Sequence, residues 1–261
     1  HNNISPLDSR YANKIPEFRK NFSEYSLIKI RFDIEIDWLI FLCTKLPKLF
    51  KPISKQSIKK LELFKNDFND KYVLQIKKIE ATTNHDVKAV EYFIRDHFNK
   101  DKILSGYTHL IHFGLTSEDI NSLSYAYLVK NGIKLFANEV SIINKTLKSY
   151  SSKWSKISFL ARTHGQPASP STIGKELKVF SSRIDREIKT LKTIKPLAKF
   201  SGATGNFHTF DIVDNKVNWP TINKKFIHQF GIEQNLYTTQ IEPHDWIAEV
   251  SHSIVRINNI L

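Results

Sequence analysis

The sequence has little of several residue types that mark particular classes of protein. Its 261 residues include one cysteine, Cys43, and no methionine. A single cysteine cannot form an internal disulfide, so a reducing compartment is the simpler expectation and Cys43 is a candidate core residue. Eight glycines and nine prolines are too few for a collagen-like or low-complexity chain. Because methionine is absent, we expect that His1 is not the native start.

Long apolar runs are missing as well. The longest strongly apolar run is Trp38–Cys43, whereas a membrane-spanning helix needs about 20 such residues. The first residues carry no signal-peptide core. We therefore expect no membrane partner and a cytoplasmic location.

Positive charge predominates, because 39 Lys and Arg stand against 26 Asp and Glu and give a net charge of +13. Such an excess is typical of proteins that bind nucleic acid or anionic surfaces. Here the basic residues are spread along the chain in short pairs such as Lys59-Lys60, Lys77-Lys78 and Lys224-Lys225. This distribution favours a solvated lysine-rich surface, and we expect no nucleic-acid partner.

Apolar residues recur at helical spacing and strand-like alternation is almost absent, so the sequence predicts an all-α fold. The expected helices cover residues 22–46, 54–68, 117–150, 170–196 and 244–261. The long apolar stripes predict a helix bundle.

We expect an N-terminal helical domain over residues 1–110 and the first part of a long-helix bundle domain over residues 111–261. The last apolar pattern reaches Leu261 without Gly or Pro, so we expect the chain to be the amino-terminal part of a longer protein.

Polar residues gather just before helix starts. Thr83 and Thr116 each lie three residues before an aspartate, Asp86 and Asp119, which is the spacing of a capping box. Capping alone explains this pattern, but helix N-termini also bind anions. Both interpretations stay open at this point.

Two further polar segments, 162–172 and 237–245, also precede helices. In the first, Pro170 suits a first helical turn. His164 stands beside Gly165 and Gln166, and it is either a structural residue or a proton-transfer group, because histidine titrates near neutrality. Phosphate-loop, dinucleotide, C-x-x-C and H-E-x-x-H motifs are absent, and we expect no metal site.

Together these segments resemble the bacterial type of the adenylosuccinate lyase family, within the fumarase/aspartase superfamily of helical lyases. The similar segments follow the family's order and cover nearly the whole chain: residues 5–11 (SPLDSRY), 82–91 (TTNHDVKAVE), 116–121 (TSEDIN), 162–167 (RTHGQP), 171–176 (STIGKE) and 237–245 (YTTQIEPHD).

The resemblance implies β-elimination of fumarate from adenylosuccinate, giving AMP, and from SAICAR, giving AICAR, in purine biosynthesis without a cofactor. It implies that His164 is the general acid and that His85 orients substrate or transfers a proton. The implied substrate-binding residues are Arg10, Tyr11, Asn84, His85, Asp86, Thr116, Ser117, Gln166 and Gln240.

The resemblance also implies a homotetramer whose active sites are shared between subunits. The family's signature loop, which carries the serine base, has no match here, so the base and the C-terminal domain are expected beyond Leu261. Two alternatives stay open: another lyase of the superfamily, such as argininosuccinate lyase, and a non-catalytic basic helical scaffold.

Overall fold

The computed structural model describes residues 5–261, and these fall into two units that are described separately. Unit 1 comprises residues 5–129 and Pro196–Pro243, and unit 2 comprises Lys130–Lys195 and His244–Leu261. Within the described range the elements are helical apart from four short strands, which confirms the predicted all-α class. The boundary expected near residue 110 stays a prediction. Among the described residues, no helix is both long and apolar enough to cross a membrane.

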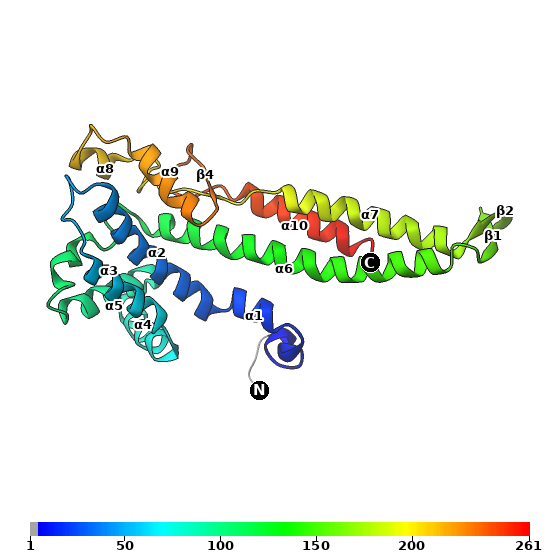
Figure 1. The fold of residues 1–261 in the computed structure, drawn as a ribbon, viewed down its shortest axis with the longest axis horizontal. Helices are drawn as coiled ribbons and strands as arrows, with labels where there is room; N and C mark the ends of the chain where they lie inside the picture. Colours follow the sequence, from blue (N-terminus) through cyan, green and yellow to red (C-terminus); the bar gives the residue numbers. More distant parts are fainter. Residues whose placement is uncertain (1–4) are drawn as a thin grey trace. The chain divides into compact units, whose positions relative to one another are not determined.

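Unit 1 is built around helix α2, whose buried residues lie on several faces. Figure 1 labels this helix and its neighbours along the chain. Its elements are η1 (Pro6–Asp8), η2 (Ala12–Lys14), α1 (Pro16–Phe22), α2 (Glu24–Lys45), α3 (Lys55–Asn66), α4 (Asp70–Thr83), α5 (Asp86–Asn99), η3 (Ser105–Leu110), the first part of α6 (Ser117–Lys153), β3 (Leu197–Ala198), α8 (His208–Val213), α9 (Trp219–Gln229) and β4 (Glu233–Gln234). Helix α2 contacts α3, α4 and α5. Cys43 is buried on α2, as predicted.

Trp38 of α2 lies at the centre of an aromatic cluster. Its ring lies 4.9 Å from that of Phe226, 5.1 Å from Phe200 and 6.2 Å from Phe210, measured between centroids. Its indole N–H donates to the carbonyl of Phe113 over 2.9 Å. Because a buried indole N–H needs an acceptor, this bond fixes the ring within the apolar core.

The helix predicted over residues 22–46 is interrupted once, and that part of the prediction is wrong. The chain is extended at Ser23, whose hydroxyl accepts from the backbone N–H of Ser26 and caps α2. A serine can end one helix and cap the next without Gly or Pro. The helix expected over residues 54–68 is confirmed as α3, with Ser54 as its cap.

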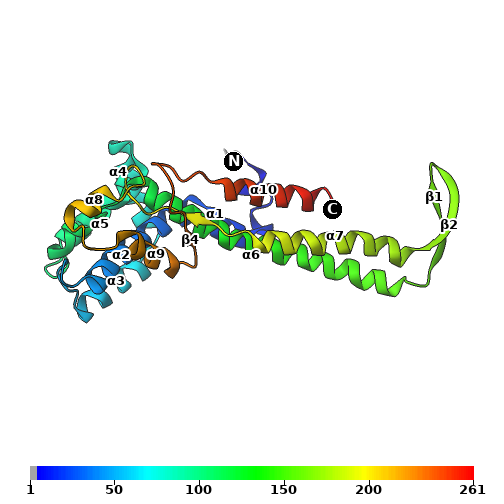
Figure 2. The ribbon, with the colours of Figure 1, turned by 90° about the horizontal axis from the view of Figure 1, so that it is seen from above.

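Unit 2 contains the rest of α6, the hairpin of β1 (Ser158–Thr163) and β2 (Gln166–Thr172), helix α7 (Ile173–Thr193) and α10 (Asp245–Asn258) (Figure 2). Gly174 allows α6 and α7 to approach closely, because a Cβ there would lie 2.3 Å from the carbonyl oxygen of Ser151. Helix α10 packs on α7, where Arg256 pairs with Glu187 over 2.8 Å. The long helices predicted for this part of the chain are confirmed.

The start predicted for the helix after residue 170 is wrong. Pro170 lies in β2, and α7 begins at Ile173 with the Thr172 hydroxyl as its cap. Strands β1 and β2 pair as an antiparallel hairpin. Their residues are mostly exposed, so no apolar alternation marks them in the sequence.

A buried ion pair joins the start of α6 to the segment after residue 196. Asp119 and Lys199 are both fully buried, and the Lys199 ammonium lies 2.8 Å from an Asp119 oxygen. Asp119 also accepts from the backbone N–H groups of Thr116, Ser201 and Gly202. The carboxylate thus reaches back to Thr116, which confirms the predicted capping function of Asp119.

Replacement of Lys199 by methionine leaves this carboxylate buried without its cation. We expect Lys199→Met to lower the free energy of unfolding by about 3–5 kcal/mol, the range for breaking one side of a buried pair. Urea unfolding followed by circular dichroism measures this loss. Lys216→Met, at an exposed position of the same unit, is the control and should leave the midpoint unchanged. A Lys199→Met protein as stable as the wild type would contradict the prediction.

A second buried ion pair joins α2 to the segment between η3 and α6. The His112 ring contacts the buried Glu35 carboxylate over 2.6 Å. Burial lowers the pKa of His112, but the negative charge and hydrogen bond of Glu35 raise it, and the pKa lies above the ordinary value of 6.5. The folded protein therefore binds this proton more tightly than the unfolded chain does.

This pairing makes stability depend on pH. The pair contributes fully to the stability of the fold when the pH is below 6.5, the pKa of the histidine in the unfolded chain. This contribution is lost as the pH rises through the higher pKa that His112 has in the folded protein. We expect the difference in unfolding free energy between wild type and His112→Gln to be larger at about pH 6 than at about pH 8. Urea unfolding at both pH values tests this. An equal difference at both would show that the pair does not stabilise the charged ring.

Candidate active site

The link between α4 and α5 places the first group of candidate residues. Asn84 ends α4 in the left-handed region (φ 50°), where asparagine is better tolerated than most residues. His85 is the N-cap of α5, and its Nδ1 accepts from the backbone N–H of Lys88 over 3.3 Å. The capping box predicted for Thr83 is wrong, because Thr83 is the last residue of α4 and His85 does the capping.

The cap also determines what the other ring nitrogen of His85 does. Because a backbone N–H only donates, Nδ1 is the acceptor and the neutral ring carries its proton on Nε2. Nε2 lies 3.2 Å from the hydroxyl oxygen of Ser117, at the start of α6. His85 therefore presents a hydrogen-bond donor beside Ser117, and two segments predicted to bind substrate lie together in unit 1.

Thr116 lies next to Ser117 but has a different task in the fold. Its backbone N–H and its hydroxyl both donate to the Asp119 carboxylate, over 2.8 Å and 3.3 Å, so Asp119 engages both groups at the start of α6. Ser117 has the freer hydroxyl, facing His85 at the positive end of a 37-residue helix. Such an end attracts negative charge.

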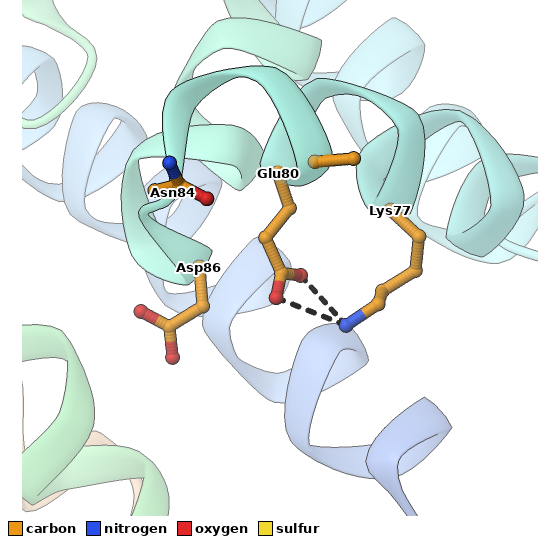
Figure 3. Close-up of a pocket in the computed structure, with 5 residues that line it drawn as sticks. Lys77, Glu80, Asn84 and Asp86 are labelled. Atoms are coloured by element: carbon orange, nitrogen blue, oxygen red, sulfur yellow. Dashed lines mark hydrogen bonds and ion pairs between the residues drawn. The ribbon is translucent and has the colours of Figure 1, made fainter.

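A pocket of about 540 Å³ lies beside this group, and Lys77, Glu80, Ala81, Asn84 and Asp86 line it (Figure 3). Lys77 pairs with Glu80 and with Glu24 of α2. Hydrogen bonds to these two carboxylates raise the pKa of Lys77 above its ordinary value. Lys77 and Glu80 are not among the residues predicted from the sequence, although a Lys–Glu pair three residues apart, within the two turns before Asn84, was a local signal.

Asp86 is the first residue of α5 and borders the same pocket. Its carboxylate lies 2.8 Å from the guanidinium of Arg31 and accepts from the N–H of Val87 over 2.8 Å. Burial raises the pKa of Asp86, but the charge of Arg31 and the hydrogen bond from Val87 lower it by more than burial raises it. The pKa of Asp86 therefore lies below its ordinary value. Asp86 is therefore ionised at neutral pH.

Gln240 lies in the loop between β4 and α10. The N–H of Glu242 reaches Glu118 of α6 over 3.5 Å, which brings this loop toward the residues beside Ser117. Gly205 packs against the loop, since a Cβ there would lie 2.1 Å from the carbonyl oxygen of Thr238. The 202–206 turn is not among the features predicted from the sequence, although two glycines three residues apart mark it.

Arg10 and Tyr11 lie between η1 and η2. The Arg10 guanidinium lies 5.4 Å from the centre of the Tyr11 ring, at cation–π distance. Within residues 5–261, the structure brings these two side chains against each other rather than against His85 or Ser117.

His164 and Gln166 belong to unit 2, where they lie at the turn of the β1–β2 hairpin. His164 (φ 51°) and Gly165 (φ 75°) are the two turn residues, and Gln166 opens β2 opposite Thr163. Consecutive left-handed residues are typical of the tight turns that join twisted strands. The turn exposes the His164 ring to solvent. The residues at 84–86 and 116–117 thus lie together in unit 1, Arg10 and Tyr11 contact each other in the same unit, and His164 and Gln166 form a pair in unit 2.

Comparison with known proteins gives curated relatives along the whole chain. It is 43% identical to an adenylosuccinate lyase of Buchnera aphidicola subsp. Schizaphis graminum, over 99% of this chain and 57% of the relative. It is 39% identical to that of Escherichia coli K12, again over 99% of this chain and 57% of the relative. The chain therefore spans just over half the length of these relatives.

The fold is similar to that of a fumarate lyase from Mesorhizobium sp. BNC1, with a TM-score of 0.76 at 17% identity over 94% of this chain and 54% of that one. At this identity the likeness concerns the fold alone. A family profile described as lyase matches residues 9–261, and the chain therefore belongs to this lyase family.

Proposed function

We propose that the protein is an adenylosuccinate lyase, which releases fumarate from adenylosuccinate to give AMP and from SAICAR to give AICAR. The observation that carries the proposal is the placement of the His85 Nε2 donor 3.2 Å from Ser117 at the start of α6. A donor, a hydroxyl and a positive helix end suit an anionic nucleotide substrate. The curated relatives support the choice of substrate.

The reaction is a β-elimination. A base removes a proton from the succinyl carbon next to a carboxylate, the electron pair forms the double bond of fumarate, and the C–N bond breaks. An acid then protonates the departing nitrogen. Developing negative charge needs donors that are already in place. These steps require proton transfer and charge stabilisation alone, so we propose that the enzyme uses no cofactor.

We assign the acid to His164 and substrate contacts to the other candidate residues. His164 lies at an exposed turn, so in this proposal the substrate that it protonates is held by residues from elsewhere in the assembled enzyme. Thr116, Ser117, Asn84, Asp86, Gln166, Gln240, Arg10 and Tyr11 contact the substrate in this proposal. The base is assigned to no residue of this chain.

The assembled enzyme is a homotetramer in this proposal, with sites shared between subunits. Exposed apolar side chains on the long helices, such as Ile142, Val179 and Val255, support association. We also propose a cytoplasmic location and the division into residues 1–110 and 111–261.

The acid assignment is tested with His164→Ala in the complete gene product. Loss of a general acid is expected to lower the rate of fumarate formation from adenylosuccinate by at least ~10²-fold. Absorbance of the released fumarate gives the rate. His109→Ala, at another exposed histidine, serves as the control and should keep the full rate. Equal rates for His164→Ala and wild type would move the acid role to another group.

His85 is tested by separating its cap from its donor. His85→Asn keeps a strong N-cap for α5 but is too short to place a donor beside Ser117. We expect KM for adenylosuccinate to rise ~10-fold with an unchanged unfolding midpoint, since one substrate hydrogen bond is lost. His85→Ala should raise KM similarly and also lower stability by about 1 kcal/mol. An unchanged KM in His85→Asn would exclude the donor role.

A further inference from the structure

A buried cation of helix α2 contacts the first residue of α5. Arg31 of α2 is 3% exposed, and its Nη2 lies 2.8 Å from the carboxylate of Asp86. A buried guanidinium is strongly unfavourable unless an anion pairs with it. The position of Arg31 therefore constrains the position of the Asp86 carboxylate.

Asp86 links the Arg31 guanidinium to the backbone of α5. One carboxylate oxygen meets Arg31, and the other accepts from the N–H of Val87 in the first turn of α5. His85 directly precedes it, and the His85 Nδ1 lies 3.7 Å from the same oxygen that Val87 contacts. The ion pair thus anchors the turn that contains Asn84, His85 and Asp86 to α2.

The neighbouring carboxylates have other cationic partners. Glu35, one turn further along α2, contacts His112, while Glu91 of α5 pairs with Lys88 and Arg95. Among the described residues, the Arg31 Nε atom has no hydrogen-bond partner. Within the described part of the chain, Asp86 is the carboxylate that forms an ion pair with the Arg31 guanidinium.

We propose that Arg31 is a positioning residue of the candidate site: through Asp86 it fixes the Asn84–Asp86 turn and so directs the His85 Nε2 donor toward Ser117. Arg31 itself does not touch substrate. Its effect on catalysis rests on the proposed function, whereas its effect on the turn does not.

The test compares Arg31→Met and Arg31→Lys in the complete gene product. Amide hydrogen exchange, followed by mass spectrometry, reports the order of residues 84–89 directly. We expect exchange there to be at least ~10-fold faster in Arg31→Met, because the start of α5 loses its anchor. Arg31→Lys keeps a charge that pairs with Asp86 and should recover part of the protection.

Kinetics separate positioning from general destabilisation. KM for adenylosuccinate should rise ~10-fold in Arg31→Met while kcat changes by less than ~3-fold, as for lost substrate binding. The double variant Arg31→Met, Asp86→Asn should show no higher KM than Asp86→Asn alone, because Arg31 acts through Asp86. Additive effects in the double variant would overturn the proposal.

Lys65→Met is the matched control, since Lys65 also pairs with an acid on α2, Asp37, but from α3. It should leave exchange at residues 84–89 and KM unchanged. Unchanged exchange there in Arg31→Met would overturn the proposal.

If Arg31→Met does not fold, amide exchange at residues 84–89 in Asp86→Asn decides, because this variant removes the same pair at a half-exposed position. Absence of fumarate release by the wild type would overturn the proposed function, and the exchange result would still decide the role of Arg31.

Discussion

Asp119 is the group on which the candidate site in unit 1 depends. Its buried carboxylate caps α6 through Thr116 and holds Lys199 and the backbone at Ser201 and Gly202. Ser117 therefore stands at a helix start that a non-local contact fixes as well as a local one. The same contact holds the turn that packs against the loop of Gln240. One fully buried anion thus relates segments that are about 80 residues apart in the chain.

The candidate residues differ in how firmly their own unit holds them. His85 is fixed twice, by the cap of α5 and by its contact with Ser117. His164 is an exposed residue of a two-residue hairpin turn. A substrate-holding group benefits from a rigid support, whereas a proton donor need only reach the departing atom when the substrate is bound. The two kinds of support agree with the roles proposed for these histidines.

The long helices were readable from the sequence because their apolar residues recur at three- and four-residue spacing over many turns. The Thr116–Asp119 cap was readable for a similar reason, since its partners are local. Ser23 was missed because serine permits a helix break without requiring one. The hairpin was missed because its exposed strands have no apolar face. Arg31 was missed because its partner, Asp86, is distant in the sequence and only the folded helices bring the two together.

The hairpin turn has a consequence for how this protein tolerates change. A histidine with φ of 51° occupies a backbone region that glycine and asparagine adopt at lower cost. The residue best suited to the turn is thus not the residue found there. Glycine or asparagine at position 164 would lower the backbone cost but remove the imidazole to which we assign the acid role, so the proposed function and the backbone favour different residues at this turn.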